Sequence, residues 1–262
     1  MRLSPTRNES LLLLAFLALC VLALAGPAIA QPPQAHDFAD QRALWGLPHA
    51  LDVLSNLPFV LAGAWGLRLL QRVPSGELFA AQRACAGLFF LGLLTTAVGS
   101  TAYHLAPNDW GLAWDRTGMS VAFAGLLGLV AAARVSDRAG LALSAALLVL
   151  GPVSAIACLL TGNVLAWAVV QFGGIALLLL VLAFGKDRLA AWPVRWSLVL
   201  LAYAVAKLAE ANDAAVLQAT GELFSGHTLK HVVAAFAAAP VLFALGSQAR
   251  RQNGRSVAAQ SA

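Results

Sequence analysis

The sequence predicts an all-α polytopic membrane protein, a seven-transmembrane helix bundle preceded by an N-terminal signal peptide or an additional helix. Hydrophobic residues make up 60% of the 262 positions and charged residues only 11%, which is too apolar for a soluble domain of this size. Apolar windows of about 20 residues recur along the chain, and each is long enough to cross a bilayer as a helix. No stretch between these windows is long enough for a separate soluble domain.

The first apolar run, residues 11–25, follows Arg2 and Arg7 and leads through Gly26-Pro27 to Ala28-Ile29-Ala30. A basic start, a short apolar core and a small-x-small sequence before Gln31 are typical of a cleavable secretory signal. An uncleaved first helix is the alternative, so residues 1–30 are either a signal peptide or an additional N-terminal helix.

A segment of residues 31–50 precedes a membrane domain of residues 51–248, and a disordered tail of residues 249–262 follows it. The seven spans that we expect in the membrane domain are 51–71, 84–104, 114–134, 139–160, 164–184, 193–213 and 223–246. Three cysteines lie in or beside apolar runs without metal-type spacing, so no disulfide framework is implied: Cys20, Cys85 and Cys158.

Charge distribution predicts the orientation of the bundle. Basic residues gather in one set of loops and in the tail: Arg68, Arg72, Arg83, Arg134, Arg138, Lys186, Arg188, Arg195, Arg250, Arg251 and Arg255. Acidic residues gather in the opposite set: Asp37, Asp40, Asp109, Glu210, Asp213 and Glu222. Because Lys and Arg remain on the cytoplasmic side, the tail is predicted to be cytoplasmic and residues 31–50 external. The net charge of +5 is scattered over loops, so it does not indicate a nucleic-acid partner.

Ionisable residues within apolar spans are costly and usually functional. The ionisable residues within the apolar spans of this chain are His104, Asp115, Lys207, His227, Lys230 and His231. Ser100 is an uncharged polar residue in the same setting. Counting about 1.5 Å per residue from the cytoplasmic ends of the spans places five of these side chains at a similar depth near the external face. The five are Ser100, His104, Asp115, His227 and His231.

Helical spacing predicts that these side chains form a metal site. His227 and His231 are four residues apart, so both imidazoles can face one ion, and Ser100 shares a helix face with His104 in the same way. Three neutral imidazoles and a water form the usual catalytic zinc site with an open position, and Asp115 could hold the water. The plainer interpretation is that each histidine is an interfacial residue. Lys207 and Glu210 are expected to form a structural ion pair, and Lys230 to snorkel or to pair with an acid.

Four sequence motifs resemble the alkaline ceramidase family and the wider seven-helix hydrolase superfamily that contains it. They are Asp52-Val-Leu-Ser55-Asn56, Gly99-Ser100-Thr-Ala-Tyr103-His104, Asp115-Arg-Thr-Gly-Met119 and His227-Thr-Leu-Lys-His231. Each motif is weak alone, but their order and intervals fit the family from about Asp37 to Gly246, and most closely its bacterial members.

This resemblance implies a function and its residues. His104, His227 and His231 would bind Zn²⁺, Ser100 would help to stabilise the oxyanion, and Asp115 would orient or deprotonate water. The expected reaction is hydrolysis of a lipid amide, such as ceramide, to a fatty acid and an amino-lipid such as sphingosine. Tyr103 and Asn56 are expected to line the substrate site. The implied location is the bacterial inner membrane, with the active site near the external face.

A calcium site is a weaker expectation from the same resemblance. Asp37 and Asp40 are similar to part of an acidic calcium-binding segment, but Arg42 and His49 stand where oxygen ligands are expected. An external loop that packs on the bundle is the alternative.

Two other functions stay open. One is a non-catalytic metal-binding membrane protein, such as a receptor, a transporter or an inactive remnant. The other is the same chemistry on a non-sphingoid N-acyl lipid. A membrane lipid is the expected partner, and the sequence offers no basis for naming a protein partner.

Overall fold

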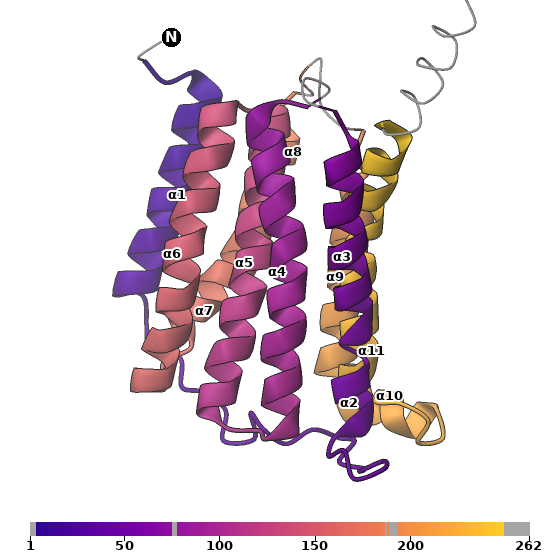
Figure 1. The fold of residues 1–262 in the computed structure, drawn as a ribbon. Coiled ribbons are helices and arrows are strands. Elements are labelled where there is room, and N and C mark those ends of the chain that lie inside the picture. The colour runs from indigo at the N-terminus through magenta and orange to yellow at the C-terminus, as the bar shows by residue number, and fades with distance from the viewer. Residues whose placement is uncertain (1–3, 75–77, 187, 189–192, 249–262) are drawn as a thin grey trace, which may run out of the picture.

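The computed structural model describes residues 4–74, 78–186, 188 and 193–248, and the predicted tail of residues 249–262 lies outside them. In this part of the chain the structure is an all-α bundle with two isolated β-bridges and no strand (Figure 1). Its elements are α1 (Arg7–Ala25), α2 (Ala50–Leu54), α3 (Leu57–Arg72), α4 (Ala80–Leu105), α5 (Asp109–Arg134), α6 (Asp137–Thr161), α7 (Leu165–Ala168), the π-helical turn η1 (Val169–Gly173), α8 (Gly174–Phe184), α9 (Trp196–Ala211), α10 (Asp213–Ala219) and α11 (Gly226–Phe236).

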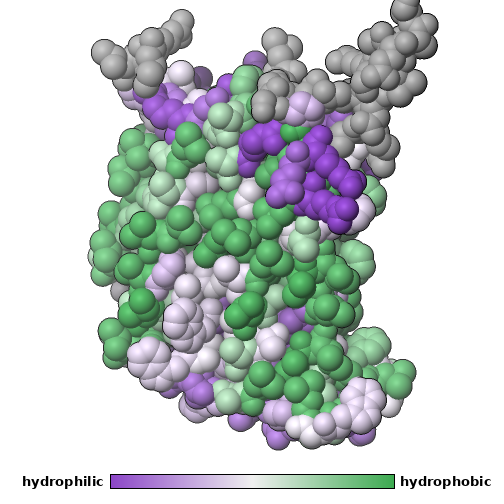
Figure 2. All heavy atoms as spheres, in the orientation of Figure 1, coloured by the Kyte–Doolittle hydropathy of each residue, from purple (hydrophilic) through white to green (hydrophobic). Residues whose placement is uncertain are grey.

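Seven helices in the described residues are long and apolar enough to cross a membrane. They confirm the predicted class of polytopic membrane protein. Figure 2 shows hydrophobic side chains over much of the middle of the visible face and hydrophilic side chains gathered toward the upper end. The seven spans are Arg7–Ala25, Ala50–Arg72, Ala80–Leu105, Asp109–Arg134, Asp137–Thr161, Leu165–Phe184 and Gly226–Gln248.

The set of spans differs from the predicted set at two places. The N-terminal helix α1 is one of the seven, whereas the predicted sixth span, 193–213, corresponds to the 16-residue helix α9. A membrane helix usually needs about 20 residues, so α9 is short. Pro193 precedes its start, and at the other end the Asn212 amide donates to the carbonyl of Leu208 at 2.7 Å. Proline does not fit a helix interior, and a side-chain bond to the last-turn carbonyls favours a helix end.

Three spans carry local breaks of the α-helix. The span Ala50–Arg72 turns at residues 55–56, between α2 and α3. The last span turns at residues 237–238, between α11 and a second helical stretch at residues 239–248. Pro240 explains this turn, because proline lacks an N–H and its ring meets the carbonyl four residues earlier, that of Phe236. In the sixth span of the structure, η1 inserts a π-helical turn between α7 and α8. Such turns occur often at functional sites, and this one carries Gln171, which lines a cavity described below.

Helices α4 and α5 form the most intimate contact of the bundle, and glycines make it possible. A Cβ atom on Gly125 would lie 2.1 Å from the backbone nitrogen of Phe89, and one on Gly92 would lie 2.2 Å from that of Ala122. Small residues let membrane helices approach with backbones in contact. This approach packs α4 against α5 and places the end of α4 beside the start of α5.

The N-terminal helix is tied to the bundle at both ends. Near its start, Glu9 forms an ion pair with Arg138 at 2.7 Å and accepts a hydrogen bond from Ser136 at 2.5 Å. Beyond its end, Ile29 and Gln31 pair with residues 162–164 of the loop between α6 and α7. The predicted cleavage site before Gln31 therefore lies in a segment hydrogen-bonded to the bundle. Its cleavage stays a prediction.

Replacing Gly125 by alanine is expected to destabilise the bundle. The added methyl group cannot fit against the Phe89 backbone without separating α4 from α5, and overpacking of this kind costs about 1–3 kcal/mol. Thermal unfolding in detergent should show a lower midpoint. Gly87→Ala is the matched control, because its Cβ would meet only the Leu70 side chain at 3.5 Å. An equal loss in both variants would contradict the close packing at Gly125.

Candidate metal and catalytic site

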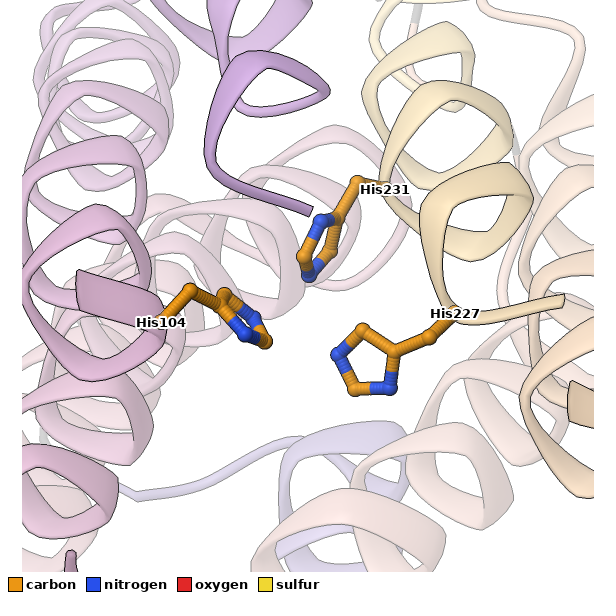
Figure 3. Close-up of side chains that lie close together, drawn as sticks. All are labelled: His104, His227 and His231. Carbon is orange, nitrogen blue, oxygen red and sulfur yellow. The ribbon is translucent and has the colours of Figure 1, made fainter. Parts of the chain in front are cut away.

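Three histidines from two helices face one another inside the bundle (Figure 3). His104 comes from the end of α4, and His227 and His231 come from α11. One ring nitrogen of each can be chosen so that all three lie within 4.8 Å of one another. The side chains are 0%, 9% and 3% exposed, respectively. Within the described residues, this is the group of histidine, cysteine and acidic side chains whose geometry suits a metal ion.

The histidine nitrogens have unmet bonding capacity, which fits a metal. Among the described residues, neither ring nitrogen of His104 has a hydrogen-bond partner, and Nε2 of His227 also has none. A buried polar atom without a partner costs free energy, so such atoms are rare in folded proteins. A cation held between the three rings would satisfy these nitrogens. Three imidazoles are a usual ligand set for zinc with one position left open.

Ser55, in the turn between α2 and α3, orients the third imidazole. Its hydroxyl donates to the carbonyl of Asp52 at 2.9 Å and lies 2.8 Å from Nδ1 of His231. Because a serine hydroxyl has one hydrogen, the contact with Nδ1 must be donated by the imidazole. His231 therefore carries its proton on Nδ1, and the Nε2 lone pair faces the other two rings. A hydrogen bond of this kind fixes the tautomer of a metal-ligating histidine.

Two aspartates hold the start of α11 in place. The Asp213 carboxylate accepts from the backbone N–H of His227 at 2.7 Å and from that of Ala39 at 2.9 Å. Asp52 accepts from the Thr228 hydroxyl at 2.7 Å. Because anions are favourable at a helix N-terminus, these contacts stabilise the first turn of α11 and set the position of His227.

Sequence reasoning did not assign Ser55, Asp213 or Phe38 to the site. The Phe38 ring packs on His104 and His227, with centroids 4.6 and 4.7 Å away. Ser55 belongs to a motif that we quoted, but nothing in its spacing indicates a contact with His231, 176 residues away. Phe38 lies before the first predicted span of the membrane domain and Asp213 at the last position of the predicted span 193–213, where periodicity does not report what a side chain touches.

Ser100 and Asp115 lie beside the histidines, as their spacing predicted. Ser100 Oγ is 3.4 Å from Nε2 of His231, and Ser100 also interacts with the Asp115 carboxyl group. Gly99 makes the neighbourhood possible, because a Cβ there would lie 2.6 Å from the carbonyl oxygen of Trp114. With no side chain at Gly99, the start of α5 comes close enough for Asp115 to reach the site.

A cavity of about 440 Å³ joins these residues to the surface. Its lining includes Ser100, Asp115 and two of the histidines, together with apolar side chains from α4, α5, α7, η1 and α9. Tyr103 lines it, and its hydroxyl lies 2.9 Å from His36. Asn56 is not among the described residues that line this cavity. Its amide instead donates to the Asp52 carbonyl at 2.9 Å, within the α2–α3 turn.

The charged residues of α9 and α11 also line this cavity. Glu210 pairs with Lys207, as expected, and with Lys230 at 2.8 Å. Lys230 lies in the wall of the same cavity as His227 and His231, with its ammonium group paired to Glu210 of α9. The second expectation for Lys230, pairing with an acid, is confirmed.

The candidate calcium ligands are placed in the loop before α2. Both oxygens of Asp40 are bound by the Arg42 guanidinium, at 2.8 and 2.6 Å, and its pKa is held below its ordinary value mainly by that bond. A calcium ion would have to displace Arg42 to use these oxygens. Asp37 donates its backbone N–H to the carbonyl of Gln34 in a turn. The calcium site stays a prediction.

Comparison with known proteins adds no assignment. No protein-family model matches the chain, and no curated protein matches it either. The geometry of the site therefore carries the functional argument.

Removing one imidazole is expected to remove the metal. His104→Ala, His227→Ala and His231→Ala should each purify with much less than one zinc per chain, because two ligands hold zinc far more weakly than three. Elemental analysis of detergent-purified protein measures this content. His36→Ala is the control, since His36 bonds to Tyr103 and Asp109 outside the cluster. Stoichiometric zinc in all three variants would contradict the site.

Ser55→Ala tests the orientation of His231. Losing the partner of Nδ1 should weaken zinc affinity by about 10- to 100-fold without abolishing it, as for other hydrogen-bond partners of metal-binding histidines. Competition with a chelator of known affinity measures the change. Ser154→Ala is the matched control, because that buried hydroxyl bonds only within its own helix, to the carbonyl of Gly151. Equal affinities in the two variants would count against this role.

Proposed function

We propose that this chain is a zinc-dependent intramembrane amidohydrolase that cleaves the N-acyl amide of ceramide or a related lipid. One observation carries the proposal: three buried imidazoles converge beside Ser100 and Asp115, and two of them line the same largely apolar cavity as these residues. The resemblance of the four sequence motifs to the alkaline ceramidases agrees with it. Those motifs supply all five of these residues.

Each residue has a role that the chemistry requires. The three histidines would hold the zinc ion, which, when bound, acts as a Lewis acid toward the amide carbonyl and makes a neighbouring water acidic near neutral pH. Ser100 would donate its O–H to the oxygen that gains negative charge as the carbonyl is attacked. Asp115 would take a proton from water and deliver it to the leaving amine, which cannot depart as an anion.

The cavity suits the substrate of such a reaction. A volume of about 440 Å³ falls within the range of ligand sites, and the lining is mainly aromatic and aliphatic. Part of the wall is open to the exterior of the bundle, because Phe172 on η1 lines the cavity and is 57% exposed. In a membrane this position faces lipid, so an acyl chain can enter sideways while its amide reaches the histidines.

Asp115→Asn separates metal binding from catalysis. The amide keeps the size of the side chain but cannot accept the proton, so hydrolysis of a ceramide in mixed micelles should fall by about 10²- to 10⁴-fold. Zinc content should stay at the wild-type level. Thr117→Val is the control on the same helix, because its hydroxyl bonds only to the carbonyl of Ala113. A wild-type protein that holds zinc but cleaves no lipid amide would overturn the proposal.

A further inference from the structure

A charged cluster lies in the wall of the cavity, beside the proposed catalytic residues. Glu210 on α9 forms ion pairs with two lysines, Lys207 on its own helix and Lys230 on α11. Lys207 also lies over the ring of Phe172 on η1, at 5.8 Å from its centroid. All four residues line the cavity. The cluster thus reaches from the cavity mouth to the helix that carries two of the histidines.

The charges of this wall do not balance. The cavity lining contains three cations, Lys207, Lys230 and Arg116, but only two carboxylates, Glu210 and Asp115. Arg116 forms no ion pair in the described part of the chain; it bonds to Gln31 and Cys158 and lies over the Trp167 ring. The lining thus carries one more cation than carboxylates in a site that is otherwise largely apolar. An unpaired charge in such surroundings is costly, and a ligand anion would offset that cost.

The position of Lys230 indicates where on the ligand this anion lies. Lys230 precedes His231 and is three residues after His227, so its side chain starts about 5–6 Å from that of His227 on the helix surface. It lines the same cavity as His227, His231 and Asp115. An anion bound by Lys230 must therefore be attached a few bonds from the reacting amide. A carboxylate on the carbon next to the amide nitrogen meets this requirement.

We infer that the cavity selects N-acyl amino acids, in which a carboxylate beside the amide pairs with Lys230 and Lys207 while the acyl chain occupies the apolar wall. This inference rests on the proposed hydrolase activity and names its substrate class. Hydrolysis forms a C–O bond from water to the acyl carbon, breaks the C–N bond and transfers a proton to the amine. The products are a fatty acid and a free amino acid.

A purely structural cluster makes a different prediction. If the two lysines serve only to pair with Glu210 and to hold α9 against α11, replacing either one will affect all substrates alike. If they bind a carboxylate, the effect will depend on the charge of the substrate. The ratio of rates for two substrates that differ only in this charge separates the two roles, even where a variant loses overall activity.

The test compares N-oleoylglycine with N-oleoylethanolamine, which differ mainly in a carboxylate against a hydroxymethyl group. The full chain, purified with zinc in detergent, should show a higher kcat/KM for the glycine amide. Lys230→Met and Lys207→Met should each lower the ratio of the two kcat/KM values by about 10- to 100-fold, the size of one charge-assisted hydrogen bond. Lys207→Arg should keep most of the preference. Lys186→Met, in the exposed loop after α8, is the matched control and should keep the wild-type ratio.

Each outcome decides one point. A wild-type preference for the neutral amide, or a ratio unchanged in both lysine variants, overturns the substrate assignment and leaves the hydrolase proposal standing. Zinc-loaded protein that cleaves neither amide, and no ceramide, overturns the hydrolase proposal itself. Zinc analysis of each variant shows whether its site is still assembled.

Discussion

The central constraint on this protein is the burial of three imidazoles in a low-dielectric interior. His104, His227 and His231 lie almost fully out of solvent, and several of their nitrogens lack a partner among the described residues. Such an arrangement is stable when a shared ligand satisfies the rings, and a metal ion does so for all three at once. Much of the surrounding structure serves to bring these rings together and to keep their lone pairs facing inward.

Two mechanisms of positioning meet at this site. On one side, glycines along α4 and α5 allow backbone contact, and the last of them toward the site, Gly99, brings Asp115 beside Ser100. On the other side, polar contacts fix α11: Asp213 bonds the N–H of His227, and Ser55 bonds the ring of His231. Close packing fixes the distance between helices, and hydrogen bonds fix the direction in which a side chain points. Together they set both the separation and the orientation of the three imidazoles.

The wall of the cavity adds a second layer of chemistry. Lys207, Glu210 and Lys230 join α9 to α11 on the side that faces η1, where the helix is interrupted by a π-helical turn. The same cavity therefore presents two histidines of the candidate metal cluster, an apolar wall and more cations than carboxylates. The proposed substrates, which combine an acyl chain, an amide and a carboxylate, would be complementary to all three features.

Composition and helical periodicity determined the membrane class, because burial in lipid demands long apolar helices and leaves few alternatives. Depth and i, i+4 spacing also predicted that five side chains would meet: Ser100, His104, Asp115, His227 and His231. Helices that cross a bilayer lie roughly parallel to its normal, so side chains at the same depth lie at the same level of the bundle. Only the tertiary structure decided what depends on neighbours distant in sequence. It showed that α1 packs into the bundle, that α9 is short, that Ser55 and Asp213 orient the histidines, and that Lys230 faces the cavity. These features arise from contacts between segments far apart in the chain, and no local pattern of residues encodes which segments will meet.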